Sequence, residues 1–322
     1  MGRVALMAAG AAAWMVAMAP VHAQNFRGKT IEVVVAAPTG SAPDVIARML
    51  GEGVRVKLGA NLVIENKPGA GGIIAVNQVK AGPKNGTKLL FAPGSTVAIS
   101  PLTFKQAEFN FDNDFEAVSI VAETPMLMTT RADGAVASLA SALAAVRSVP
   151  EAVSIGNPGI FSIPHLVGEL VGQATGTRFR QIPFSTPAQG VQAAVNGDID
   201  IFVDGVAALL PMVAAGRLRA LAVTAPKELP GLEGIALAKD TVPGLVVSGW
   251  FGIFAPKGTP DALIGELNAA AAEVLRNPDV IARQRKLGTY PVGGSVTEAK
   301  AFVKAEQSSW AKVIHNAGIK PQ

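Results

Sequence analysis

The chain has 322 residues, of which 49% are apolar and 16% charged, and it contains no cysteine. This length is typical of about two globular domains. The lack of cysteine excludes a disulfide scaffold, a cysteine-ligated metal site and a thiol nucleophile. With 28 Lys and Arg against 24 Asp and Glu, the net charge is +4. Such a small, dispersed excess does not indicate a nucleic-acid-binding face, which needs clustered Lys and Arg.

The first 23 residues are typical of a secretory signal peptide. Arg3 gives a basic start, residues 4–19 are uncharged, and the segment ends in small residues up to Ala23. The run is shorter than the roughly 20 apolar residues of a membrane anchor, and Pro20 breaks it. We therefore expect cleavage after Ala23. The remaining chain has 27 Lys and Arg (28 less Arg3) against 24 acidic residues, a net charge of +3, and we expect a periplasmic monomer.

Short β-like runs alternate with helical patterns in the rest of the chain, which is typical of α/β architecture. The first series alternates strand and helix, and its expected elements are a strand at 31–36, a helix from about Asp44, a strand at 61–65, a helix at 72–80 and a strand at 88–92. Right-handed crossovers make such strands largely parallel.

A second series follows the apolar runs 118–122 and 126–128. Its expected elements are a strand at 153–155, a helix at about 164–174, a strand at 179–182, a helix at about 187–196 and a strand at 199–203. The second of these helices has Ser185 or Thr186 as its N-cap and Gly197 past its end. The expected C-terminal elements are strands at 218–224 and 250–256, a helix capped by Thr259 and Pro260, and a final helix from about Thr297.

The long apolar runs at 118–128 and 218–224 bracket the middle series. We therefore expect two α/β lobes joined by two crossover strands. Lobe 1 comprises 24–124 and 225–322 in this interpretation, and lobe 2, residues 125–224, is inserted into it. Such a fold places the strand-to-helix loops of both lobes around one cleft, where α/β proteins bind ligands.

Motifs for nucleotide binding and catalysis are missing. The sequence has no phosphate-binding GxxxxGK[ST] loop and no GxSxG nucleophile elbow. The GAGGII stretch at 69–74 has Ile74 where a dinucleotide fingerprint needs its third glycine, which favours a packing or turn role.

Metal-binding patterns are missing as well, and we expect neither metal nor cofactor. His165 and His315 have no second His or Cys at ligand spacing. Asp112, Asp114 and Glu116 lack the glycine and distal Glu of a calcium loop, and are interpreted as a solvated turn.

Four loops that precede expected helices share small, neutral, hydrogen-bonding residues. They are Thr39-Gly40-Ser41, Gly94-Ser95-Thr96, residues 156–162, and Ser185-Thr186. Helix N-termini carry unpaired N–H groups and the positive end of the helix dipole, so such loops can hold an anion without Arg or Lys. Any one loop could equally serve only as a helix cap, but four of them around one cleft favour binding.

Several stretches spread over the chain match one family pattern. They are residues 31–44, 64–72 (IENKPGAGG), 215–224 (AGRLRALAVT), 250–260 (WFGIFAPKGTP) and 310–320. On these residues the chain resembles the Bug-type extracytoplasmic solute receptors of tripartite tricarboxylate transporters. The resemblance implies a two-lobed periplasmic binding protein of the type II-like, Venus-flytrap class. It also implies a receptor without enzymatic activity, which closes on a small carboxylate and delivers it to membrane transporter subunits.

The resemblance implies ligand contacts from loops of both lobes. Carried over by position, these residues are Thr39, Gly40, Ser41, Ala42, Asp44, Ser95, Thr96, Asn157, Phe161, Ser162, His165, Phe184, Ser185, Thr186 and Asp204. In the family, backbone groups and ordered waters hold the carboxylate, which agrees with the absence of Arg and Lys here. Seven residues separate Asn157 from His165 where relatives have about four, and Phe184 replaces a tyrosine. These departures favour a larger or aromatic mono- or dicarboxylate, with Ile160, Phe161 and Phe184 against its carbon skeleton.

Two other functions stay open from the sequence. The chain could present its ligand to a sensor partner and serve regulation instead of uptake. It could also be a periplasmic hydrolase that uses His165 with Ser162, for which no motif gives positive support.

Overall fold

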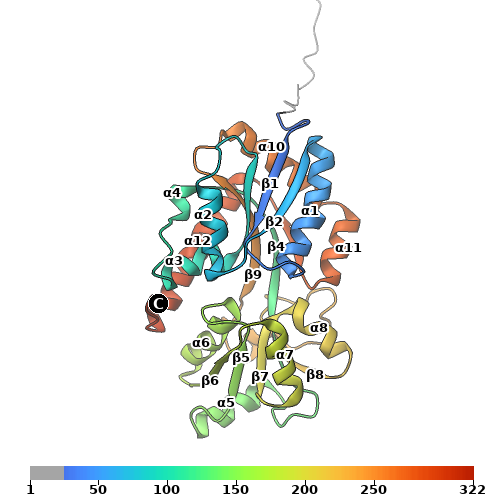
Figure 1. The fold of residues 1–322 in the computed structure, drawn as a ribbon. Coiled ribbons are helices and arrows are strands. Elements are labelled where there is room, and N and C mark those ends of the chain that lie inside the picture. The colour runs from blue at the N-terminus through green and yellow to red at the C-terminus, as the bar shows by residue number, and fades with distance from the viewer. Residues whose placement is uncertain (1–24) are drawn as a thin grey trace, which may run out of the picture.

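The computed structural model describes residues 25–322, so the predicted signal peptide and its cleavage site lie outside the described residues. Two α/β lobes lie end to end, and the long strand β4 (Phe115–Arg131) runs from one into the other (Figure 1). The predicted fold class, a two-lobed α/β receptor fold, is confirmed. No helix within residues 25–322 combines the length and the apolarity that a membrane crossing requires.

Lobe 1 begins with the predicted parallel β–α–β–α–β series. Its elements are β1 (Thr30–Val35), α1 (Ala42–Leu58), β2 (Asn61–Asn66), α2 (Ile73–Lys80) and β3 (Lys88–Pro93). β1 lies between β2 and β3 and is parallel to both. Alternate side chains of β1 point to opposite faces, so Val33 packs with α1 whereas Val34 packs with α2.

The C-terminal part of the chain completes lobe 1. It supplies β9 (Ser248–Pro256), α10 (Asp261–Leu275), α11 (Pro278–Lys286), β10 (Tyr290–Gly293) and α12 (Val296–Asn316). β9 is antiparallel to both β3 and β4, and so joins the N-terminal strands to the strand that leaves the lobe. Two short helices, α3 (Ser100–Thr103) and α4 (Phe111–Asp114), lie between β3 and β4. Asn110 caps α4, and Asp114 and Glu116 pair with lysines. The expected solvated turn at 112–116 is therefore wrong: Asp112 and Asp114 lie in α4, and Glu116 lies in β4 with its side chain only 12% exposed.

Lobe 2 is a second sheet with helices on both faces. Its elements are α5 (Leu139–Ser148), β5 (Ser154–Asn157), α6 (Ile163–Thr175), β6 (Arg180–Pro183), α7 (Pro187–Asn196), β7 (Ile201–Gly205), α8 (Val206–Ala214) and β8 (Leu218–Val223). β7 is parallel to β5 and antiparallel to β4, which also pairs with β8. The helix predicted at 187–196 has those bounds, with Thr186 as its N-cap.

The segment 225–247, which carries the short helix α9 (Ala238–Thr241), packs on lobe 2. Val242 and Leu245 belong to an apolar cluster with α5 and α6, and Leu232 belongs to one with α8 and β8. The sequence expectation assigned this segment to lobe 1. We therefore propose that lobe 2 comprises 125–247 and that the chain returns to lobe 1 at Ser248.

Thr224 joins the two crossings between the lobes. Its Oγ1 accepts from the N–H of Met126 at 2.9 Å and donates to the carbonyl of Val247 at 2.5 Å. The N–H of Thr224 in turn donates to the carbonyl of Met126 at 2.9 Å. Because Thr224 is fully buried, these bonds hold β4 and the segment before β9 side by side at the hinge.

Candidate ligand-binding site

The carboxyl ends of four strands meet at the boundary between the lobes. β1 and β3 end there in lobe 1, and β5 and β7 end there in lobe 2 (Figure 1). Two contacts mark the boundary: the ring centroids of Phe104 and Phe161 are 6.1 Å apart, and Gly205 at the end of β7 lies against Thr124 of β4. Ligands of α/β proteins bind outside the carboxyl ends of such strands.

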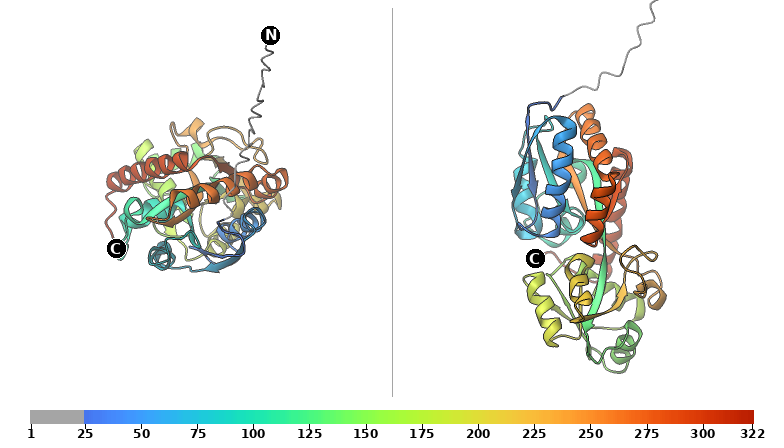
Figure 2. Two further views of the ribbon diagram at one scale, coloured as in Figure 1. Left: turned by 90° about the horizontal axis from the view of Figure 1, so that it is seen from above. Right: turned by 90° about the vertical axis from the view of Figure 1, so that its right-hand side faces the viewer.

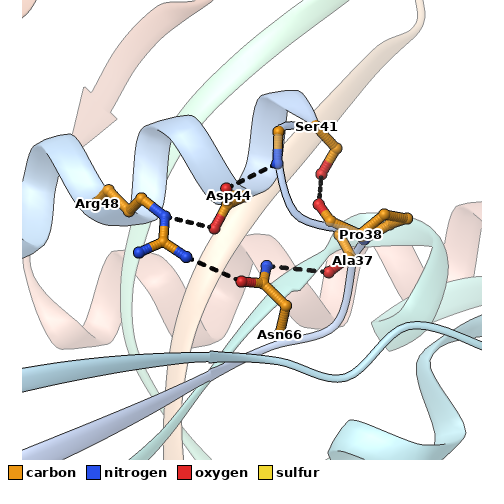
Figure 3. Close-up of polar contacts among 7 residues, drawn as sticks. Ala37, Pro38, Ser41, Asp44, Arg48 and Asn66 are labelled. Carbon is orange, nitrogen blue, oxygen red and sulfur yellow. Dashed lines mark hydrogen bonds and ion pairs between the residues drawn. The ribbon is translucent and has the colours of Figure 1, made fainter.

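The loop between β1 and α1 is held by Asp44 and Asn66, as Figure 3 shows. The Asp44 carboxylate accepts from the N–H of Gly40 at 2.8 Å and from Arg48 Nε at 2.8 Å. Arg48 also donates to Asn66 Oδ1 at 3.0 Å, and Asn66 Nδ2 donates to the carbonyl of Ala37 at 3.1 Å. Asp44, predicted as a ligand contact, is 2% exposed and has both oxygens engaged within this loop.

The electrostatics of Asp44 follow from these contacts. Burial raises the pKa of its carboxyl, but the hydrogen bonds from Arg48, Gly40 and Asn66 outweigh it and lower the pKa below its usual range. The charge of Arg48 is thereby tied to Asp44. Ser41 at the N-cap of α1 accepts no side-chain cap hydrogen bond, and its hydroxyl donates to the carbonyl of Pro38 at 2.5 Å. The N–H groups in the first turn of α1 therefore receive no side-chain cap.

The segment after β3 is Gly94 followed by a π-helical turn at Ser95–Ile99, and it is packed from two sides. Thr96 is 1% exposed and lies against Gly72, where an added Cβ would approach Thr96 Oγ1 to 2.3 Å. On the other side, Gly94 rests on the indole of Trp250. Gly72 has φ +93°, a conformation that favours glycine. The glycine-rich stretch at 69–74 thus has the packing and turn role that was expected.

The loop between β5 and α6 is held by its own hydrogen bonds. Asn157 is fully buried, its Oδ1 accepts from the N–H of Gly159 at 3.2 Å and its carbonyl accepts from the N–H of Phe184 at 2.8 Å. Ser162 caps α6, since its Oγ accepts from the N–H of His165 at 3.3 Å and donates to the carbonyl of Gly159 at 2.7 Å. Ser162 and His165 therefore form a helix cap and not a hydrogen-bonded nucleophile and base.

His165 lies nearly buried at the start of α6. Its imidazole Nδ1 is enclosed and has no hydrogen-bond partner among the described residues. Burial lowers the pKa of His165, which favours the neutral ring near pH 7. The ring contacts Phe161 edge-on with a centroid separation of 6.0 Å.

Phe161 has an unusual backbone conformation and joins the lobes. Its φ of +59° is rare for a residue with a side chain, and such strain concentrates at functional sites. The buried ring fits between His165 of lobe 2 and Phe104 of lobe 1. By contrast, its neighbour Ile160 is 45% exposed.

Asp204, near the end of β7, has one oxygen unpaired. Its Oδ1 accepts from the N–H of Gly205 at 2.7 Å, whereas its enclosed Oδ2 has no partner among the described residues. Although part of the residue reaches the surface, burial of the carboxyl raises its pKa to about 7, and the hydrogen bond from Gly205 only partly opposes this. Within residues 25–322, no Lys or Arg forms an ion pair with Asp204.

The loop before α7 provides the remaining predicted contacts. Thr186 Oγ1 accepts from the N–H of Gln189 at 3.3 Å and caps the helix, and Ser185 beside it is exposed. The Phe184 ring is half-buried and contacts Phe202 edge-on. The structure thus brings the predicted residues of all four loops and Asp204 to one boundary, although several of them also have structural roles.

The sequence analysis missed the residues that support these loops. Asn66 and Arg48 hold the first loop, Gly72 and Trp250 pack the second, and Phe104 meets Phe161 across the boundary. The signals for the first four were present, because Asn66, Gly72 and Trp250 lie in the family-like stretches and Arg48 lies one helical turn after Asp44.

Other sites offer less. A cavity of about 600 Å³ lies between α1 and α10, far from lobe 2, and contains none of the predicted residues. It adjoins Asn25, where the described chain begins. Within residues 25–322, no group of three or more His, Asp or Glu side chains is placed to hold a metal ion.

Known proteins are similar to this chain in architecture and in sequence. The model of the tripartite tricarboxylate transporter family receptor matches residues 46–319. Protein BugT of Bordetella pertussis is 28% identical over 304 residues, which cover 94% of this chain and 93% of BugT. A Rhodopseudomonas palustris protein solved with adipate is 28% identical with a TM-score of 0.83, covering 91% of this chain and 99% of that one.

MatC from Rhodopseudomonas palustris, solved with bound malate, is 27% identical with a TM-score of 0.77, covering 89% of this chain and 99% of MatC. The family match spans most of the chain, so the predicted resemblance is confirmed. The chain belongs to the receptor family of the tripartite tricarboxylate transporters.

Proposed function

We propose that the protein is a periplasmic, non-enzymatic receptor that captures an organic carboxylate between its lobes and delivers it to the membrane subunits of a tripartite transporter. The observation that carries this proposal is the meeting of four strand ends at the lobe boundary, where His165 Nδ1 and Asp204 Oδ2 are enclosed without partners. A buried polar atom without a hydrogen-bond partner destabilises the protein. A ligand that forms hydrogen bonds with such atoms removes this cost, which favours binding.

Helix N-termini supply the attraction for the anion. The uncapped first turn of α1, near Ser41 and Ala42, offers N–H groups and the positive end of the helix dipole. The predicted contacts include neither Lys nor Arg, and the nearby Arg48 is paired with Asp44. Relatives solved with adipate and malate support the carboxylate class.

The far end of the ligand meets a different environment. Ile160 and Phe184 offer partly exposed apolar surface, whereas Phe161 is taken up by its contacts with Phe104 and His165. An ionised Asp204 repels a second carboxylate, so Asp204 fits a ligand hydroxyl or a protonated carboxyl. We therefore propose that the ligand is larger than malate or carries an aromatic ring.

Calorimetric titration of the purified protein tests this function. The panel is adipate, malate, benzoate and a hydroxybenzoate, and we expect at least one to bind. Absence of binding by every acid of the panel would contradict the proposal.

Variants in the loops that carry the predicted ligand contacts test where the ligand binds. Ser41→Ala and Ser95→Ala each remove a hydroxyl of a predicted and partly exposed contact, and a lost hydrogen bond of about 1 kcal/mol weakens binding roughly fivefold. Ser308→Ala is the matched control, because its hydroxyl only donates to the carbonyl of Lys304 within α12. Equal affinities in all three variants would place the ligand elsewhere.

Delivery to a transporter is tested in cells. Deletion of the gene is expected to abolish uptake of the acid that calorimetry identifies, and re-expression should restore it. Normal uptake with lost induction of a response to that acid would instead support the regulatory role.

A further inference from the structure

Glu306 of α12 accepts hydrogen bonds from two buried tryptophans with one oxygen. Its Oε2 lies 2.8 Å from Trp250 Nε1 and 3.1 Å from Trp310 Nε1. Trp250 is 1% exposed and Trp310 4% exposed. A buried indole N–H needs an acceptor, so Glu306 fixes the positions of both rings.

Trp250 supports the loop after β3. A Cβ atom at Gly94 would lie 2.4 Å from Trp250 Nε1 and 2.5 Å from its Cε2, so the Gly94 backbone rests directly on the indole. Trp250 also lies opposite Glu123 of β4, one residue before Thr124 near the crossing between the lobes. Because protein interiors are close-packed, a shift of this indole displaces the loop that carries Ser95 and the crossover strand beside it.

Trp310 connects α12 to lobe 2. Figure 2 shows α12, in red, descending along lobe 1 to the boundary between the lobes. Trp310 belongs to an apolar cluster in which most members come from lobe 2, including α6 and the segment 225–247. Gln173 Nε2 of α6 also donates to the carbonyl of Val313 at 3.5 Å. A cavity of about 240 Å³ beside these contacts is lined by Glu306 together with α6 and the segment that leads into β9.

We infer that Glu306 is a positioning residue for ligand capture, which couples the Gly94–Thr96 loop of lobe 1 to the position of lobe 2 through Trp250 and Trp310. The inference rests on the proposed receptor function. Gly94 packs against the Nε1 side of the Trp250 indole, the atom that donates to Glu306. Among the described residues, the hydrogen bonds of Glu306 go to the two tryptophans and to none of the predicted ligand contacts. Glu306 therefore acts on ligand binding through the two indole rings. For this role the hydrogen-bond acceptor at position 306 matters more than the negative charge of Glu306.

Three variants test the coupling. Glu306→Leu removes the acceptor for both indoles, whereas Glu306→Gln keeps a carbonyl oxygen in the same place. Trp310→Phe removes one indole donor but keeps an aromatic ring packed against lobe 2. This variant replaces Glu306→Leu in the test if Glu306→Leu fails to fold. The chain has no cysteine, so Val63→Cys in β2 and Val149→Cys after α5, both at least half exposed, accept dyes that report the separation of the lobes.

Single-molecule energy transfer is measured first without ligand and then with adipate. We expect Glu306→Leu and Trp310→Phe to broaden the distribution of lobe separations relative to the unsubstituted dye-labelled chain, and Glu306→Gln to restore it. The affinity for an acid from the panel should fall at least fivefold in Glu306→Leu and less than twofold in Glu306→Gln. If Glu306 serves only stability, its variants have a lower unfolding midpoint, but the distribution of lobe separations and the affinity of the folded protein stay unchanged.

The outcomes separate this inference from the proposed function. A folded Glu306→Leu variant with the original distribution overturns the coupling, as does a Glu306→Gln variant that behaves like Glu306→Leu. If Glu306→Leu does not fold, an unchanged distribution in Trp310→Phe overturns it. If no acid of the panel binds the unsubstituted chain, the receptor function fails, while the measurement without ligand still decides the coupling.

Discussion

Asp204, the residue before the last of β7, has one carboxyl oxygen bonded to the N–H of Gly205 and the other enclosed without a partner in the described part of the chain. Its burial is not compensated by an ion pair with any Lys or Arg of residues 25–322, and the pKa of the carboxyl rises to about 7. In the unfolded chain the same group has an ordinary pKa near 4. The folded protein therefore retains a proton between about pH 4 and pH 7 that the unfolded chain releases.

This difference predicts the pH dependence of stability. The contribution of Asp204 is fully present below about pH 4 and is lost as the pH rises through about 7. Asp204→Asn keeps the acceptor for Gly205 and removes the titration. In urea unfolding, the stability of the original protein relative to Asp204→Asn should fall by on the order of 1–3 kcal/mol from pH 5 to pH 8.

The control for this experiment is Asp198→Asn, which changes an exposed aspartate that ends no strand. It should follow the original protein at both pH values. If the difference between the original protein and Asp204→Asn is the same at pH 5 and pH 8, the pKa of Asp204 is not raised by folding.

Helix starts at the lobe boundary differ in how their first turns are satisfied. Ser162 caps α6 and Thr186 caps α7, whereas Ser41 turns its hydroxyl back to Pro38 and leaves α1 without a side-chain cap. The sequence pattern treats these loops alike, because each places small polar residues before a helix. α8 also lacks a side-chain cap, but it begins beside the carboxyl of Asp204. The uncapped start of α1 is therefore the better candidate for the anion-binding end.

The cap of α7 can be tested against its neighbour. Thr186→Ala removes the bond to the N–H of Gln189 and should lower the free energy of unfolding by about 1 kcal/mol. Ser185→Ala, one residue earlier, is exposed, lies outside the helix and should change it by less than about 0.5 kcal/mol. Equal losses in urea unfolding would show that Thr186 Oγ1 is not the cap.

Most elements with regular patterns were predicted, but α5 and α11 were missed although Ser138 and Asn277 cap them. Alternating and helical periodicity gave α7 its observed bounds and the strands of both lobes to within a few residues. α8 was missed because it begins at Gly205 without a side-chain cap and contains Pro211, both of which argue against a helix in sequence. β10 was missed because it is short, contains Pro291 and exists through its pairing with β4.

The two lobes depend on Thr224 where the chain crosses between them. Its hydroxyl is the acceptor for the N–H of Met126 and a donor to Val247, both in the buried hinge. A receptor that closes by hinge motion absorbs the movement at a few such positions. With the proposed lobe 2 of 125–247, we propose that this hinge lies at 124–126 and 247–248.

Thr224→Val should therefore destabilise the whole molecule. It leaves the buried N–H of Met126 without its acceptor, which lowers the free energy of unfolding by about 1–3 kcal/mol. Thr224→Ser keeps the hydroxyl and should lose clearly less. The measurement is urea unfolding followed by circular dichroism, and a Thr224→Ser variant as unstable as Thr224→Val would contradict the role of the hydroxyl.

The sequence by itself determined the α/β class, the parallel order of the first strands, the family and the loops that face the boundary, because periodicity, turn residues and motifs act over short stretches. Only the tertiary structure decided which of those loop residues are free to meet a ligand. Asp44, Phe161 and Thr96 are buried by partners distant in the sequence or in the other lobe, among them Asn66, Phe104 and Gly72. Such long-range contacts, like the return of the chain at Ser248 and the pairing of two tryptophans on one carboxylate, leave no local pattern from which they could be read.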